Sequence, residues 1–111
     1  MHQEHMHVAI SSAAAGGAVA IFAKNLQHAE QLAHDVEGVV PEEYAEKIIR
    51  ANGRRVIHLH GGGSIRFIST RQSARGLSLD RVFVPIGTDD TTLADIVPSL
   101  CTSEDGVLTG Y

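Results

Sequence analysis

The stretch of residues 54–85, RRVIHLHGGGSIRFISTRQSARGLSLDRVFVP, decides the fold. Two β-rich runs, 54–60 and 65–69, flank three consecutive glycines, and this pattern is typical of a β-hairpin. The apolar run at 79–84 is typical of a strand that is buried on both faces of a sheet. Residues 70–78 have no sustained period, so we expect a loop between the hairpin and this strand.

A strand and a helix are predicted on the N-terminal side of this stretch. Residues 18–23, AVAIFA, form a continuous apolar run, which again indicates a strand covered on both faces. Asn25 is a favourable N-cap, and apolar residues recur at helical spacing from Leu26 to Val36. Gly38 stands where the end of a helix favours a left-handed residue.

A second helix is expected from Pro41 to Arg50. Proline is favoured at the first helical position, and acidic residues at the start with basic residues at the end suit the helix dipole. Two pairs of opposite charge, Glu43 with Lys47 and Glu46 with Arg50, have the i,i+4 spacing of helical ion pairs. The pattern predicts that these pairs lie on the exposed side of the helix.

The two ends of the chain are expected to differ. Residues 1–16 contain three histidines and several small residues, and we expect a loose lead-in to a short strand. Asp89 or Asp90 is predicted to cap a last helix, disturbed by a proline, and a short strand is expected at 107–109. Residues 17–111 then form a single three-layer α/β domain with a mainly parallel sheet and an antiparallel hairpin.

Composition indicates a soluble globular protein. The 111 residues are 43% hydrophobic and 20% charged, and a single cysteine allows no intramolecular disulfide. We see neither a secretory leader nor an apolar run of membrane-spanning length, and we therefore expect a cytoplasmic protein.

The charge is unevenly distributed along the sequence. Although the net charge is −4, residues 47–81 form a basic segment that contains eight Lys and Arg residues and one acidic residue. These cations could neutralise phosphates, or they could be spread over several faces and paired with acids.

Four segments carry a family resemblance: AVAIFAKNLQHAEQLAHDV (18–36), NGRRVIHLHGGGSIRFIST (52–70), ARGLSLDRVFV (74–84) and DIVPSLCTSEDGVLTGY (95–111). Their order and spacing resemble the ATPase domain of the large terminase subunit of tailed bacteriophages, the motor that packages DNA into capsids. The resemblance implies a phage-encoded domain with part of a P-loop NTPase core. It also implies that the second segment is a hairpin and that the third leads through an Arg-Gly pair into the Walker B strand.

The chain departs from this family at the positions that would carry the chemistry. The Walker B strand of the family ends in Asp-Glu, which serve magnesium and the attacking water, and these positions fall on Pro85 and Ile86 here. The sequence contains no Gly-Lys pair, so the lysine of a Walker A loop has no counterpart. We therefore expect a catalytically inactive domain without a cofactor, which acts by binding a protein partner or by forming a homo-oligomer.

An alternative function is a small nucleic-acid-binding protein that uses residues 47–81 to contact DNA. The planar guanidinium group suits phosphate because it can donate two parallel hydrogen bonds. Few aromatic residues are present for base stacking, which argues against a platform for single strands. Arg75 could instead pair with Asp80 and have a structural role in place of a phosphate contact. The candidate arginines are Arg54, Arg55, Arg66, Arg71 and Arg75.

Two histidines are weaker candidates for metal binding. His58 and His60 have the spacing of residues on one face of a strand, which also occurs in metal sites. A third ligand is not identifiable, so the alternative is a pair of partly exposed imidazoles. The HGGG that begins at His60 occurs in esterase oxyanion holes, but the chain has no G-x-S-x-G, and a hairpin turn explains the glycines better.

Overall fold

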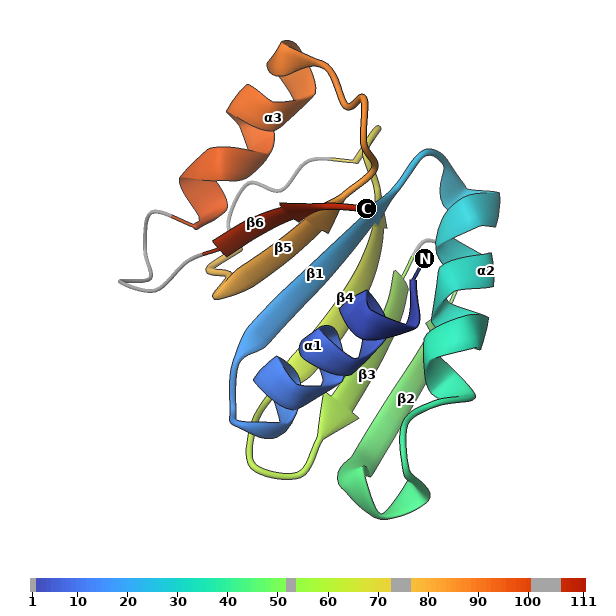
Figure 1. Ribbon diagram of the computed structural model, residues 1–111. Coiled ribbons are helices and arrows are strands. Elements are labelled where there is room, and N and C mark those ends of the chain that lie inside the picture. The colour runs from blue at the N-terminus through green and yellow to red at the C-terminus, as the bar shows by residue number, and fades with distance from the viewer. Residues whose placement is uncertain (1, 52–53, 73–76, 101–106) are drawn as a thin grey trace.

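The computed structural model describes residues 2–51, 54–72, 77–100 and 107–111. Within these residues, six strands form a sheet in the order β2-β3-β4-β1-β5-β6, and α-helices pack on it (Figure 1). The strands are β1 (Ala18–Ala23), β2 (Ala45–Ala51), β3 (Arg54–Leu59), β4 (Ser64–Ser69), β5 (Arg81–Val84) and β6 (Val107–Gly110). The α-helices are α1 (Gln3–Ala14), α2 (Leu26–Glu37) and α3 (Asp90–Ile96), and 3₁₀ turns span Glu42–Tyr44 and Val97–Ser99.

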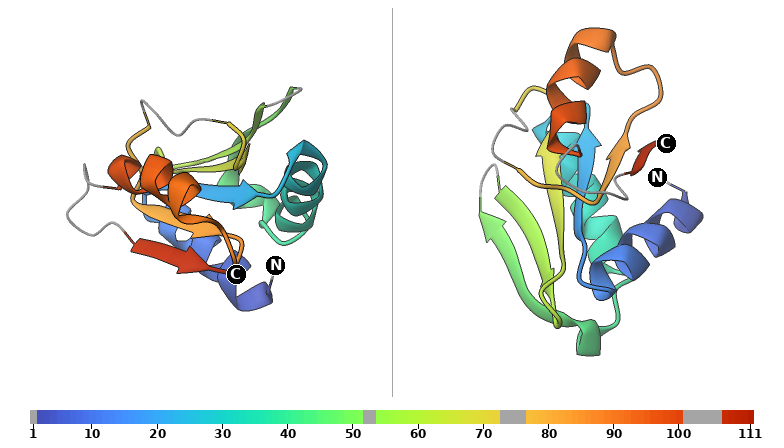
Figure 2. Two further views of the ribbon diagram at one scale, coloured as in Figure 1. Left: turned by 90° about the horizontal axis from the view of Figure 1, so that it is seen from above. Right: turned by 90° about the vertical axis from the view of Figure 1, so that its left-hand side faces the viewer.

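The sheet is mixed, with its antiparallel strands at one side. Strands β4, β1, β5 and β6 run in the same direction, whereas β3 runs antiparallel to both β2 and β4. Helices α1 and α2 lie on one face of the sheet and α3 lies on the other, as the two views in Figure 2 show. The predicted three-layer α/β class is therefore confirmed.

Strand β1 belongs to both cores of the protein, because its side chains alternate between two buried faces. Val19, Ile21 and Ala23 pack in the core beneath α1 and α2, whereas Ala20 and Phe22 pack in the core beneath α3. All five side chains are fully buried. The continuous apolar run in the sequence thus predicts this strand correctly.

The N-terminal segment is a helix, so the expected loose lead-in to a short strand is wrong. Met6, Ala9, Ile10 and Ala13 lie at helical spacing and are buried against the sheet. They belong to the same core as α2 and the central strands. Two of the small residues of this segment, Ala9 and Ala13, are fully buried and allow α1 to pack closely on the sheet.

The helix expected from Pro41 to Arg50 is wrong as well. A single 3₁₀ turn follows Pro41, and strand β2 begins at Ala45. The β-branched residues Ile48 and Ile49 pair with residues of β3, and this pairing outweighs the weak helical preference of the charged residues around them. The predicted ion pairs of Glu43 with Lys47 and of Glu46 with Arg50 need a helix, and these residues do not form one.

Helix α2 begins as predicted and ends differently. The Asn25 side chain accepts a hydrogen bond from the backbone N–H of His28 at 2.8 Å, which caps the first turn. Gly38 has a φ of −68° and lies in the right-handed helical region. The prediction that Gly38 adopts a left-handed conformation is therefore wrong, and the chain leaves the helix without it.

The three glycines form the predicted hairpin turn between β3 and β4. Gly61 and Gly62 have positive φ values of 97° and 93°, a conformation that residues with a Cβ atom rarely adopt. Gly63 is required for a different reason, because a Cβ atom there would lie 1.7 Å from the carbonyl oxygen of Ala13. The turn therefore contacts the end of α1, and this contact explains the third glycine.

The C-terminal elements agree with the prediction. Asp89 caps α3, the helix passes into a 3₁₀ turn at Val97, where Pro98 interrupts the α-helical pattern, and β6 pairs in parallel with β5. Among the residues that the structure describes, no helix is both long enough and apolar enough to cross a membrane.

We expect Asn25→Ala to lower the free energy of unfolding by about 1 kcal/mol, because it removes the N-cap of α2. Asn25→Asp is the matched control, since its carboxylate can accept the same hydrogen bond and should keep most of the stability. Urea denaturation of both variants measures the difference. Equal losses in the two variants would contradict a capping role.

We expect Gly63→Ala to lower the free energy of unfolding by about 3 kcal/mol, because the added methyl group overlaps the end of α1. The control is Gly38→Ala, where the backbone is right-handed and the added Cβ meets its nearest atom at 3.5 Å. That variant should gain about 0.5 kcal/mol through the unfolded chain. Thermal and urea unfolding would show the contrast, and a neutral Gly63→Ala would refute the close contact.

Candidate functional site

The carboxyl ends of the parallel strands form the first candidate site. Strand β1 leads into α2 through Lys24 and Asn25, and β5 leads into α3 through residues 85–89. The two helices leave this edge on opposite faces of the sheet (Figure 1). Open α/β sheets bind ligands at such a switch point, because the diverging connections leave a crevice between them.

The loop after β5 contains the two positions that the terminase resemblance assigns to catalytic acids. Pro85 is buried, whereas Ile86 is 79% exposed. The hydroxyl of Thr88 donates to the Pro85 carbonyl at 2.6 Å, which fixes the turn. Asp89 accepts the N–H of Thr92 at 2.7 Å, and hydrogen bonds from the Thr92 side chain and backbone lower the pKa of Asp89. This carboxylate therefore serves as the helix cap.

His28 and Lys24 are linked at the start of α2. The Lys24 backbone N–H donates to Nδ1 of His28 at 3.1 Å. Partial burial, and secondarily the positive charge of Lys24, lower the pKa of His28. The neutral imidazole is the form that can accept this hydrogen bond, so His28 contributes to the local fold of the loop.

Arg71 lies at the same edge, in the turn after β4. Its backbone N–H donates to the Ser69 hydroxyl at 3.2 Å, and the Gln72 side chain accepts the Ser69 N–H at 3.0 Å. A hollow of about 420 Å³ lies between Arg71 and the start of α2. A second hollow, of about 310 Å³, lies between Lys24 and the loop after β5. Lys24 and Arg71 thus each lie beside a hollow at this edge.

The second candidate site is the side of β2, β3 and β4 that faces away from α1 and α2, which we call the open face. The core beneath α3 extends only as far as Ile68 of β4 on this side. No helix of the described chain lies over β2 and β3 here (Figure 2). Strand register places Lys47, His58 and Ser64 in one row of this face and Ile49, Val56 and Arg66 in the next.

The two faces of these strands differ in how their cations are neutralised. On the side of α2, Glu37 accepts hydrogen bonds from Arg55 at 3.2 Å and from Arg50 at 3.3 Å. The Glu37 and Arg55 side chains are only 13% and 18% exposed. On the open face, Lys47 is exposed and Arg66 is partly exposed. The acid of α2 therefore neutralises cations on one face and does not reach those on the other.

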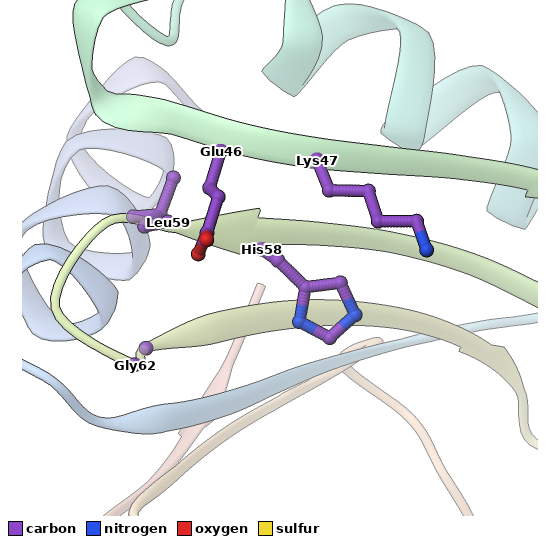
Figure 3. A pocket seen from close by; sticks show the side chains of 6 residues that line it. Glu46, Lys47, His58, Leu59 and Gly62 are labelled. Carbon is purple, nitrogen blue, oxygen red and sulfur yellow. The ribbon is translucent and has the colours of Figure 1, made fainter.

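A hollow of about 480 Å³ lies on the open face beside the hairpin turn. Glu46, Lys47 and His58 line it from two neighbouring strands (Figure 3). A bulge in β2, where the register shifts between Ala45 and Lys47, explains how two consecutive residues reach the same hollow. The site thus combines an ammonium group and an imidazole with one carboxylate.

The structure does not bring the five candidate arginines to one surface. Arg55 faces α2 and is paired, Arg66 lies on the open face, and Arg71 lies at the carboxyl edge. The Arg54 side chain and the whole of Arg75 lie outside the described residues, and so does the predicted pairing of Arg75 with Asp80. Of the described candidates, Arg66 therefore lies on the open face with Lys47, whereas Arg55 lies on the opposite side with Arg50.

The two candidate histidines occupy different settings. His58 lies in β3 and lines the hollow on the open face. His60 follows the end of β3 and is exposed in the turn. Within the part of the chain that the structure describes, no three His, Cys, Asp or Glu side chains are grouped to hold a metal ion.

Sequence reasoning missed Lys47 as a member of the site, because it placed this residue on the outside of a helix. The adjacent Ile48 and Ile49 were the signal for a strand, since two β-branched residues pack well on a pleated surface. With residues 45–51 read as a strand, alternation would have placed Lys47 and Ile49 together on one face.

Comparison with known proteins adds no assignment for this site. The chain matches no protein-family model, no curated protein and no solved structure.

Proposed function

We propose that this chain is a non-catalytic, phage-encoded binding module on a terminase-like frame, and that its open face binds the phosphate backbone of nucleic acid. The observation that carries the proposal is the charge on this face. Lys47 and Arg66 project from β2 and β4 on a side that no described helix covers. Both cations are therefore free of the acid that neutralises Arg50 and Arg55 on the opposite side.

The spacing of these cations suits an extended polyanion. Lys47 and Arg66 lie on strands separated by β3, and two strand spacings amount to about 10 Å. They would therefore contact different phosphates, with His58 between them. Ile49, which is partly exposed, lies beside this path and could contact a sugar. Because the contacts are to the backbone, we expect binding with little sequence preference.

The proposed lack of catalysis rests on the carboxyl edge. A nucleotide-hydrolysing site needs a carboxylate to hold magnesium and another to activate water, and Pro85 and Ile86 can do neither. The carboxylate that follows them, Asp89, caps α3. We infer that the frame is retained for binding.

The first test is the salt dependence of DNA binding. Fluorescence anisotropy with a labelled duplex and a labelled single strand of random sequence should show binding that weakens steeply with salt. The double variant Lys47→Gln, Arg66→Gln should reduce the slope of log K against log salt by about two. Glu46→Gln should strengthen binding, because it removes the carboxylate that lines the same hollow.

Arg50→Gln is the opposite-face control for this test, and it is charge-matched to each of the single substitutions Lys47→Gln and Arg66→Gln. It removes one positive charge from the opposite side of β2, where Arg50 pairs with Glu37. Binding by Arg50→Gln should match that of the unchanged protein. Equal weakening by substitutions on both faces, or no binding at low salt, would refute the open face as the site.

The second test concerns hydrolysis. Purified protein with ATP and magnesium should release no phosphate above the rate of a protein-free blank. Ile86→Glu should remain inactive, since one carboxylate does not rebuild the site. Phosphate release that increases in proportion to protein concentration, and persists after a further purification step, would contradict a non-catalytic module.

A further inference from the structure

Strand β6 lies at the edge of the sheet and bonds to β5 through alternate residues. The N–H groups of Val107 and Tyr111 donate to the carbonyls of Asp80 and Val84, at 3.1 and 2.9 Å. In a strand, successive residues direct their backbone polar groups to opposite sides. The odd-numbered residues of β6 therefore bond to β5.

The backbone groups of Leu108 and Gly110 consequently point away from the sheet. No strand among the described residues pairs with this outer side of β6. An edge strand with free N–H and C=O groups is a template for another strand, and proteins usually protect such edges with charge or proline. Strand β6, with the sequence VLTG, carries neither.

The side chains around this edge are apolar and exposed. Val107 and Leu108 are 40% and 38% exposed, and Ile86, at 79%, has the highest exposure among the large hydrophobic residues of the described chain. Ile86 lies against Gly110, because a Cβ atom built on that glycine would be 3.3 Å from Cγ1 of Ile86. The edge therefore joins an apolar surface to backbone donors and acceptors with which no strand of the described chain pairs.

We propose that β6 pairs antiparallel with β6 of a second copy of this chain, about a two-fold axis at Thr109. This register places Leu108 opposite the partner's Gly110, and by symmetry Gly110 opposite the partner's Leu108. Each is a hydrogen-bonded pair that exchanges two bonds, so the outward backbone groups of both strands are satisfied. The proposal is independent of nucleic-acid binding.

The side chains complement one another in this register. Leu108 of one copy meets the bare backbone of the partner's Gly110, and it can pack on the partner's Ile86 beside it. Thr109 faces its own symmetry mate as a non-hydrogen-bonded pair, an arrangement in which threonines stabilise sheets. The contact thus covers the exposed apolar residues of the edge without placing like charges together.

The other edge of the sheet fits a second copy less well. The described residues of β2 include the exposed side chains of Glu46, Lys47 and Arg50. Charged side chains along an edge strand oppose strand addition, because pairing would remove them partly from water. Two copies are therefore expected to pair through β6 and not through β2.

The test is sedimentation velocity over a range of protein concentrations. Leu108→Pro removes an N–H that points to the partner and leaves the bonds from Val107 and Tyr111 to β5 intact. Because this removes two of the bonds across the axis, the dimer dissociation constant should rise roughly 30-fold. Leu108→Lys is a second variant that places like charges at the edge and should have the same direction of effect. Circular dichroism melts confirm that each variant is folded.

Val97→Lys is the matched control. Val97 is about as exposed as Leu108, at 42% against 38%, and it lies in the 3₁₀ turn after α3. It should leave the dimer unchanged. A protein that remains monomeric at every concentration would overturn the proposal. So would a dimer that persists in folded Leu108→Lys.

Cross-linking tests the register. In a Cys101→Ser background, Thr109→Cys should form a disulfide-linked dimer under mild oxidation, because a non-hydrogen-bonded pair has Cα atoms about 4.5 Å apart. Val97→Cys in the same background should remain monomeric on a non-reducing gel. A parallel strand from another protein at this edge would leave Thr109→Cys uncross-linked, and that result would refute the two-fold pairing.

Discussion

The burial of β1 on both faces is the constraint on which the rest of the structure depends. Five consecutive apolar residues, 19–23, have no side that can face water. A strand of this kind requires neighbours in the sheet and a helix layer above and below it. Helices α1 and α2 supply one layer and α3 supplies the other. The three-layer architecture follows from this strand more than from any feature of the connecting loops.

The proposed binding surface lies where this covering ends. Helix α3 spans the part of the sheet around β1 and β5, so the hairpin strands keep one side without a helix. The charges follow the same division. Glu37 of α2 neutralises Arg50 and Arg55 on the covered side, whereas Lys47 and Arg66 remain on the other. A net negative protein can thus present a locally positive surface, because strand alternation separates neighbouring cations.

Much of the fold could be predicted from local sequence, and the failures have physical causes. Strand β1, helix α2, the hairpin and α3 have strong apolar periods or caps, and these signals agree with tertiary packing. The helix at 3–14 was missed because its buried face uses alanines among polar histidines, although Met6 and Ile10 have helical spacing. Residues 45–51 were misassigned because pairing with β3 outweighed helical charge spacing. The candidate arginines could not be assigned to faces of the sheet without that strand register.

The hydrogen bond between Ala18 and Asp80 joins residues 62 apart in sequence. By contrast, β2, β3 and β4 follow one another and pair with their sequence neighbours. A contact between residues far apart in sequence forms only after a long loop has closed, which costs conformational entropy. Pairings between sequence neighbours therefore form more readily. The sheet therefore has a local half that can nucleate early and a remote half that must wait for the chain to close. The low contact order of the hairpin strands thus favours their early formation, and the open face belongs to this half of the sheet.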